Sequence, residues 1–287
     1  MVWSCLVSIL PGMAQTEKLT DYVNPFVGTD GYGNVYPGAQ IPFGGIQISP
    51  DTDSRFYDAA SGYKYNHLTL MGFSLTHLSG TGIPDLGDFL FIPGTGEMKL
   101  EPGTHEDPDQ GYRSRYSHDK EWASPNYYAV ELADYGVKAE MTSGVRSGMF
   151  RFTYPESDNA FIMIDMNHTL WQSCEWSNLR MINDSTITGY KLVKGWGPER
   201  HVYFTATFSK KLTGLRFVQD KKPVIYNTSR FRSSYEAWGK NLMACISFDT
   251  KAGEEVTVKT AISAVSTDGA RNNMKELDGL TFNELRA

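Results

Sequence analysis

Alternation of apolar and polar residues dominates the second half of the chain. Several segments there are rich in Val, Ile, Thr, Tyr and Phe, alternate with a period of two and are separated by turn residues. These segments are YYAVEL (127–132), VKAEMT (137–142), VRSGMFRFTYP (145–155), AFIMIDM (160–166), STITGYKLV (185–193), HVYFTATFS (201–209), MACISF (243–248) and EVTVKTAISAVS (255–266). The pattern predicts an all-β fold, most simply a large antiparallel β-sandwich.

The first third of the chain follows a different pattern. From Tyr22 to about Glu121 it is dense in Gly, Pro, Asp and aromatic residues, and long periodic runs are absent. This composition predicts short strands joined by long, structured loops. No helix is expected across PGAQIPFG (37–44), because two prolines restrict the backbone there.

A helical pattern occurs only after the last predicted strand. Ser266, Thr267 and Asp268 are suitable capping residues for a helical segment over 266–287. Its apolar residues at helical spacing reach the last residue with no capping signal after them. We therefore expect this segment to be the start of a linker helix that continues into a further domain.

Composition and charge exclude several classes of protein. Of the 287 residues, 40% are hydrophobic and 21% charged, which is typical of a globular protein. The net charge of −6 and the lack of a basic cluster argue against a nucleic-acid partner. No segment approaches the run of about 20 apolar residues that a membrane span requires, so no span is expected.

The first fifteen residues, MVWSCLVSILPGMAQ, combine an apolar run with small residues in the manner of a secretory signal remnant, although a basic start is lacking. A frayed or packed N-terminus is the alternative. A signal would place the protein in a secreted or periplasmic location. There Cys174 and Cys245 could pair, but two buried free thiols fit the sequence equally well.

Common catalytic motifs are absent. The sequence has no HExxH, CxxC, GxSxG or GxxxxGK[ST], and the glycines of GTDGYGN (28–34) do not have the order of a dinucleotide-binding loop. The segment GFSLTHLSGTGIPDLGD (72–88) concentrates a histidine, hydroxyl residues and acids. Neighbours on a strand point to opposite faces, so Thr76 and His77 do not form a nucleophile and its base, and we expect no Ser/His hydrolase.

Two acidic residues in this segment have two possible roles. Asp85 and Asp88 are flanked by Pro84 and Gly87. On a loop they could bind a hard cation such as Ca²⁺ or the hydroxyls of a sugar. They could equally cap turns by accepting backbone N–H bonds.

For Trp171, Trp176 and Trp196, in the strand-rich half, we expect packing in the core or between the sheets.

Several long motifs, in one order, resemble a known family. They are VNPFVGTDGYGNVYPGAQIPFGGIQISPDT (23–52), SGYKY (61–65), the segment 72–88, YRSRYSHDKEWASPNYYAVELADYGVKAEMT (112–142), GYKLVKGWGPERHVYFTATFS (189–209) and ISAVSTDGARNN (262–273). Together they resemble the N-terminal β-sandwich domain of glycoside hydrolase family 92, the exo-acting α-mannosidases of glycan-degrading gut bacteria.

The resemblance implies a protein of two parts. Residues 20–265 would form the sandwich, and residues 266–287 would lead to a helical (α/α)₆ catalytic domain that this sequence does not contain. The family is Ca²⁺-dependent and inverting and removes terminal mannose from mannose-containing glycans. Its catalytic acid and base, and most of its Ca²⁺ site, lie in the helical domain. We therefore expect no catalytic residue in this chain and no hydrolysis by it alone, and we assign no metal ligand in it.

The expected role of this domain is to pack on the catalytic domain and to contribute loops to the sugar pocket. A sugar site needs an aromatic face and polar groups around the hydroxyls. The candidates for substrate contact are His77, Asp85, Asp88, Asp30, Asn34 and Tyr63. The family's first loop often carries histidines where this sequence has Tyr32 and Asn34. A stand-alone carbohydrate-binding sandwich and a structural sandwich without a sugar site are the alternatives.

Overall fold

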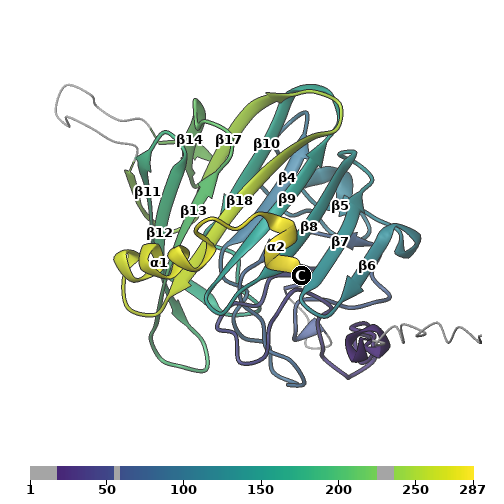
Figure 1. Cartoon of the computed structure of the whole chain (residues 1–287). Coiled ribbons are helices and arrows are strands. Elements are labelled where there is room, and N and C mark those ends of the chain that lie inside the picture. Colours follow the sequence, from purple (N-terminus) through teal and green to yellow (C-terminus); the bar gives the residue numbers. More distant parts are fainter. Residues whose placement is uncertain (1–17, 55–58, 225–235) are drawn as a thin grey trace, which may run out of the picture.

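The computed structural model describes residues 18–54, 59–224 and 236–287. Two large antiparallel sheets face each other (Figure 1). The first has seven strands, in the order β1-β3-β4-β10-β17-β14-β15. Its strands are β1 (Ser49–Asp51), β3 (Gly72–Ser74), β4 (Leu90–Thr95), β10 (Ser157–Asp165), β17 (Leu242–Thr250), β14 (Gly214–Gln219) and β15 (Lys222–Pro223).

The second sheet has nine strands, in the order β16-β11-β12-β13-β18-β9-β8-β7-β6. They are β16 (Glu236–Gly239), β11 (Ser173–Asn183), β12 (Thr186–Lys194), β13 (Arg200–Phe208), β18 (Glu254–Ser263), β9 (Ser147–Tyr154), β8 (Val137–Ser143), β7 (Tyr127–Leu132) and β6 (Glu121–Ser124). A small sheet pairs β2 (Thr69–Leu70) with β5 (Ser114–Arg115). The helical elements are η1 (Leu19–Tyr22), η3 (Pro108–Gln110), η4 (His118–Lys120), α1 (Thr267–Met274), η5 (Lys275–Leu277) and α2 (Phe282–Arg286).

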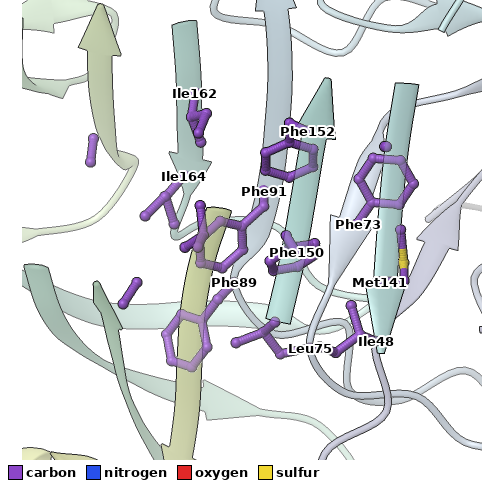
Figure 2. Packing of buried hydrophobic residues seen from close by; sticks show 14 of the residues in the cluster. Ile48, Phe73, Leu75, Phe89, Phe91, Met141, Phe150, Phe152, Ile162 and Ile164 are labelled. Carbon is purple, nitrogen blue, oxygen red and sulfur yellow. The ribbon is translucent and has the colours of Figure 1, made fainter. Parts of the chain in front are cut away.

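The main core lies between the two large sheets. Phenylalanines from both sheets meet there, with ring centroids of Phe91 and Phe150 4.9 Å apart and those of Phe89 and Phe204 4.4 Å apart. Figure 2 shows Phe91 beside Phe150 in this layer. Alternating side chains of each strand point into the layer, so burial of one face fixes the register of each strand.

Both sheets also have covered outer faces. The outward residues Phe161 and Met163 of β10 lie in a second apolar cluster with Tyr112, which comes from the connection between β4 and β5. On the nine-stranded sheet a third cluster joins Met149 of β9 to Leu277 and Phe282 of the C-terminal helical segment. This segment is drawn in yellow in Figure 1, across the front of the sheet.

The predicted all-β sandwich with a short C-terminal helical segment is confirmed, and each of the segments predicted from alternation is a strand. The cap of the helical segment is also confirmed, because the Ser266 hydroxyl accepts a hydrogen bond from the Gly269 N–H. The segment is not one helix, however. It breaks at Gly279, which has φ +75°, and restarts at Thr281 with a capping box.

Cys174 and Cys245 are free and buried, and burial raises the pKa of both thiols. The structure therefore has two free thiols and not the alternative disulfide. Within the described residues, no helix has both the length and the apolar character needed to cross a bilayer. The expected signal remnant, residues 1–15, lies outside the described residues.

Candidate functional site

Several loops meet at one end of the sandwich, below called the loop end, which comprises residues 28–36, 62–66, 77–88, 166–172 and 194–200. Backbone hydrogen bonds join these loops. The Gly80 N–H donates to the Asn34 carbonyl at 2.7 Å, and the Leu170 N–H donates to the Leu86 carbonyl at 2.9 Å. In Figure 1 the purple N-terminal loops and the loop between β12 and β13 lie at this same, lower end. The sequence motifs singled out above are therefore neighbours in space.

A buried cluster of charges around Asp88 supports the loop end. The Asp88 carboxylate lies 3.2 Å from Lys191 Nζ and 2.6 Å from Arg200 Nη1, and it accepts a 2.7 Å hydrogen bond from the Thr76 hydroxyl. Burial would raise the pKa of Asp88, but the two cations outweigh this effect and lower the pKa to about 2. Asp88 is therefore a charged anchor that ties the loop to β12 and β13.

A second buried carboxylate, Asp51 of β1, lies between two histidines. Its Oδ1 is 2.8 Å from His77 Nε2, and its Oδ2 is 2.9 Å from His168 Nε2. Burial would raise the pKa of Asp51, but the histidines outweigh it and hold the pKa well below the usual range. Lys191 donates to the His168 carbonyl at 2.5 Å, which connects this cluster to the one around Asp88.

The contacts of His77 differ from those of a catalytic triad. Its Nε2 lies 3.1 Å from the Ser74 hydroxyl, and the same nitrogen contacts Asp51. Its Nδ1 lies 2.8 Å from the Gln47 carbonyl. In a triad the base uses one ring nitrogen for the nucleophile and the other for the acid. His77 therefore holds β1 and its own loop together, and Ser74 is not placed as a nucleophile.

Three residues of the segment 85–89 adopt left-handed backbone conformations. Leu86, Gly87 and Phe89 have φ of +73°, +76° and +59°. Only glycine fits easily at position 87, because a Cβ there would lie 2.7 Å from the side chain of Leu170 and 2.8 Å from its backbone nitrogen. Asp85 accepts a 2.6 Å hydrogen bond from the Leu86 N–H. This contact is the turn-capping role, one of the two roles considered for Asp85.

The six candidate contact residues differ in exposure. Asp30 is exposed and its Oδ1 accepts from the Gly31 N–H at 2.8 Å, whereas Asn34 is largely buried with φ +50°. The structure brings His77, Asp85 and Asp88 together in one loop, and Asn34 beside that loop. Tyr63 is only 1% exposed and donates to Glu121 at 2.9 Å, so its ring face is turned to the interior.

Asp88 is a poor ligand for a cation in this arrangement. The oxygens of Asp88 already face Lys191 and Arg200, which neutralise the carboxylate. Within residues 18–54, 59–224 and 236–287 no group of three or more His, Cys, Asp or Glu side chains is arranged to hold a metal ion. Asp88 thus stabilises the loop, but through Lys191 and Arg200, which the sequence analysis did not identify as its partners.

Comparison with known proteins decides the family. A model of the glycosyl hydrolase family 92 N-terminal domain matches residues 22–263. The chain belongs to this family. The matched range contains every motif on which the resemblance was based except the end of the last one, so the family inferred from the motifs is confirmed.

Two solved structures share the fold of this family 92 domain. The family 92 glycosyl hydrolase ccman5 matches with a TM-score of 0.78 and 26% identity, over 93% of this chain and 35% of its own. The family 92 inverting mannosidase BT2199 of Bacteroides thetaiotaomicron matches with a TM-score of 0.77 and 24% identity, over 94% and 35%. The chain thus spans about a third of each of these proteins.

A relative in sequence is an uncharacterized secreted glycosidase of Arthroderma benhamiae. It is 30% identical over 139 residues, which is 48% of this chain and 17% of the relative. The chain therefore spans about a sixth of this relative's length.

The family 92 domain also carries aromatic side chains that the sequence analysis misplaced. Trp171 and Trp196 are 67% and 69% exposed, and Trp176 of β11 is 46% exposed, so the expectation of core packing was wrong. A groove of about 590 Å³ at the loop end is lined by Trp171, Trp196, Pro84, Gln172, Ser173, Glu175, Lys194 and Gly195. The sequence around Trp196 contains a signal for an exposed loop, namely Gly195, Gly197 and Pro198. This signal could have been recognised in the sequence analysis.

Proposed function

We propose that this family 92 domain is the N-terminal part of a Ca²⁺-dependent, inverting exo-α-mannosidase acting on mannose-containing glycans. The observation that carries the proposal is the family match over residues 22–263. The similarity in fold to an inverting mannosidase, of which this chain spans about a third, supports a protein of two parts. We place the enzyme in a secreted or periplasmic location, in keeping with the relative named a secreted glycosidase.

In this proposal the loop end forms one wall of the sugar pocket, and a helical catalytic domain forms the rest. The exposed rings of Trp171 and Trp196 and the polar groups of Gln172 and Lys194 line a groove suited to a sugar, because aromatic faces and hydrogen-bonding groups occur side by side. The buried charges beneath hold these loops in one arrangement, as a pocket wall requires.

The catalytic acid and base belong to the helical domain in this scheme. Inversion needs a general acid with a raised pKa and a general base, about 6.5–9.5 Å apart, with water between base and sugar. Asp51 is buried between two histidines and Asp88 is buried beside Lys191 and Arg200. The pKa values of both acids are lowered, which is the opposite of what a general acid needs. The proposal assigns most of the Ca²⁺ site to the helical domain as well, which is what the family resemblance implies.

A second candidate function is a carbohydrate-binding sandwich that acts without catalysis. The exposure of Trp171 and Trp196 beside one groove favours it, because an aromatic platform open to solvent is what a binding module needs. The two functions differ in whether this polypeptide is joined to a catalytic domain.

The test is expression of the complete reading frame that contains this chain, with α-mannobioses as substrates. The expected result is release of mannose with the β-anomer formed first, seen by proton NMR, and loss of activity with a chelator that calcium restores. Trp171→Ala and Trp196→Ala should raise KM at least about tenfold, whereas Trp122→Ala, on β6 at the sheet edge, should not change it. No hydrolysis of any α-mannoside, or the α-anomer formed first, would contradict the proposal.

A further inference from the structure

A second groove, of about 830 Å³, lies on the outer face of the nine-stranded sheet. It extends to Asn183 and Asp184 in the turn between β11 and β12, whereas the loop end is formed where β12 ends and β13 begins. Helix α1, which lies next to β12 and β13 in Figure 1, contributes Asp268 and Arg271 to one side. The groove is therefore separate from the candidate pocket wall described above.

The floor of this groove is a row of side chains across four strands. Trp238 of β16 is directly opposite Asn178 of β11, Asn178 is opposite Tyr190 of β12, and Tyr190 is opposite Tyr203 of β13. Directly opposite residues of antiparallel strands share a face. The rings of Tyr190 and Tyr203 have centroids 4.9 Å apart, and Trp238 is 54% exposed. The row therefore combines aromatic surface with an amide.

A second row beside it supplies polar groups. Glu236, Arg180 and Thr188 are opposite one another on β16, β11 and β12. Thr188 lines the groove and is only 4% exposed, and its hydroxyl has no hydrogen-bond partner in the part of the chain that the structure describes. A buried hydroxyl without a partner is unfavourable, so a ligand hydroxyl or amide that reached it would gain a hydrogen bond.

The charges of the groove exclude several ligand classes. Arg180 and Arg271 are balanced by Glu236, Asp268 and Asp184, so the lining is close to neutral and slightly acidic. Phosphates and nucleic acids need a basic surface, which this groove does not have. A neutral ligand with many hydroxyls fits both the aromatic row and the balanced polar groups.

We propose that this groove is a second, non-catalytic site that binds a neutral oligosaccharide. The pyranose rings would lie against Trp238, Tyr190 and Tyr203, and the sugar hydroxyls would bond to Asn178 and Thr188. That the sugar is built of mannose rests on the proposed function. Such a site would hold a branched or extended glycan on the protein while its terminal residue is processed elsewhere.

The experiment is calorimetric titration of the 287-residue chain with α-linked mannotetraose. The expected result is binding with a Kd of about 1 mM or tighter. Trp238→Ala should weaken binding at least about tenfold, and Thr188→Val, which keeps the shape and removes only the hydroxyl, should weaken it about threefold or more. Trp122 is the matched control, because it is 44% exposed on β6, the opposite edge strand of the same sheet. Trp122→Ala should leave Kd unchanged.

Three results would overturn the inference. They are no binding, binding that Trp238→Ala and Thr188→Val leave unchanged, and binding that is lost in Trp171→Ala, which would put the sugar at the loop end. Circular dichroism of each variant shows that its fold is intact. The hydrolysis test of the complete enzyme is independent of this one. Hydrolysis without binding to this chain would reject the second site alone, whereas binding here without hydrolysis would reject the proposed enzyme and leave the site.

Discussion

The loop end and the helix-covered face of the nine-stranded sheet are stabilised in different ways. At the loop end the Asp88 carboxylate is fully buried beside Lys191 and Arg200, and Gly87 is left-handed. The Asp51 carboxylate of β1 is fully buried between two histidines that belong to the loop end. On the helix-covered face, apolar residues such as Leu277 and Phe282 carry the contact. An apolar contact tolerates substitution by other apolar residues of similar volume. A buried ionic cluster tolerates few substitutions, because removing one partner leaves an unpaired charge in the interior.

The helix-covered face also has an ion pair, but a more exposed one. Arg151 makes two 2.9 Å hydrogen bonds to Glu140, and its guanidinium lies 4.4 Å from the centre of the Phe282 ring. The side chain of Arg151 is 15% exposed, whereas those of Lys191 and Asp88 are 0% exposed. The comparison shows that buried ion pairs hold the loops of the loop end in place, whereas apolar packing holds the helical segment on the helix-covered face.

The largest effect is expected from removing a buried cation at the loop end. Lys191→Met should lower the free energy of unfolding by about 3–5 kcal/mol, since it leaves part of the charge of Asp88 uncompensated in the interior. Arg151→Met, the matched change on the helix-covered face, should cost less, about 1–2 kcal/mol, because Arg151 is partly exposed and Lys138 still lies 3.4 Å from the Glu140 carboxylate. Urea unfolding measures both. Equal losses in the two variants would remove the distinction between the regions.

The next effect concerns the backbone of the loop end. Gly87→Ala should lower stability by about 2–3 kcal/mol, since the left-handed backbone and the contact with Leu170 both disfavour a Cβ. Gly80→Ala in the same loop is the control. Gly80 has φ +72° but open space around it, so only the cost of the backbone conformation, about 1 kcal/mol, is expected. Thermal or urea unfolding measures the stability of both variants. An equal loss of stability in Gly87→Ala and Gly80→Ala would contradict the close approach of position 87 to Leu170.

A smaller effect is expected from acid. The pKa of Asp88 is lowered from 3.8 to about 2 in the folded protein, so its contribution to stability is complete above pH 4 and is lost as the pH falls through about 2. The difference corresponds to about 2 kcal/mol. Carbon NMR of the Asp88 carboxyl should show it still ionised at pH 3. A midpoint near 3.8 would mean that Lys191 and Arg200 do not stabilise the charge.

The smallest effect is expected on the helix-covered face. Glu276 accepts hydrogen bonds from the Val145 N–H at 2.6 Å, the Arg146 N–H at 3.1 Å and the Ser147 hydroxyl at 2.6 Å. Glu276→Gln should cost about 1 kcal/mol, because a neutral amide oxygen still accepts but more weakly. Hydrogen exchange should become faster in α2 and leave the loop end unchanged. Asp278→Asn, a nearby exposed acid, is the control and should have no effect.

Local patterns missed some strands for identifiable reasons. In β11, between Cys174 and Trp176, a bulge shifts the register and interrupts the alternation by which strands are recognised. In β4, Pro93 and Gly94 resemble a turn. Pro93 is tolerated because β3 pairs with β4 only at Phe91, so no strand needs its N–H on that side.

The site was predictable in part. The sequence indicated the segment 72–88 and the loop 28–34 as candidate loops, and Asp85 has the turn-capping contact that was one of its two possible roles. The exposure of Trp171 and the burial of Tyr63 were not predictable from the sequence, because the residues next to each of them in the chain do not show whether the ring is covered. Exposure depends on what packs against a residue from elsewhere in the chain.

The sequence by itself determined the strands with regular alternation, the helix cap at Ser266 and the family, because each depends on residues close together or on long motifs in one order. The tertiary structure alone decided the partners of Asp88, since Arg200 lies 112 positions away along the chain. It also decided the row from Trp238 to Tyr203, because that row exists only through strand register. The period of buried residues along a strand can be read from neighbouring positions in the sequence. The pairing of strands and of charged side chains depends on which distant segments come together in the fold.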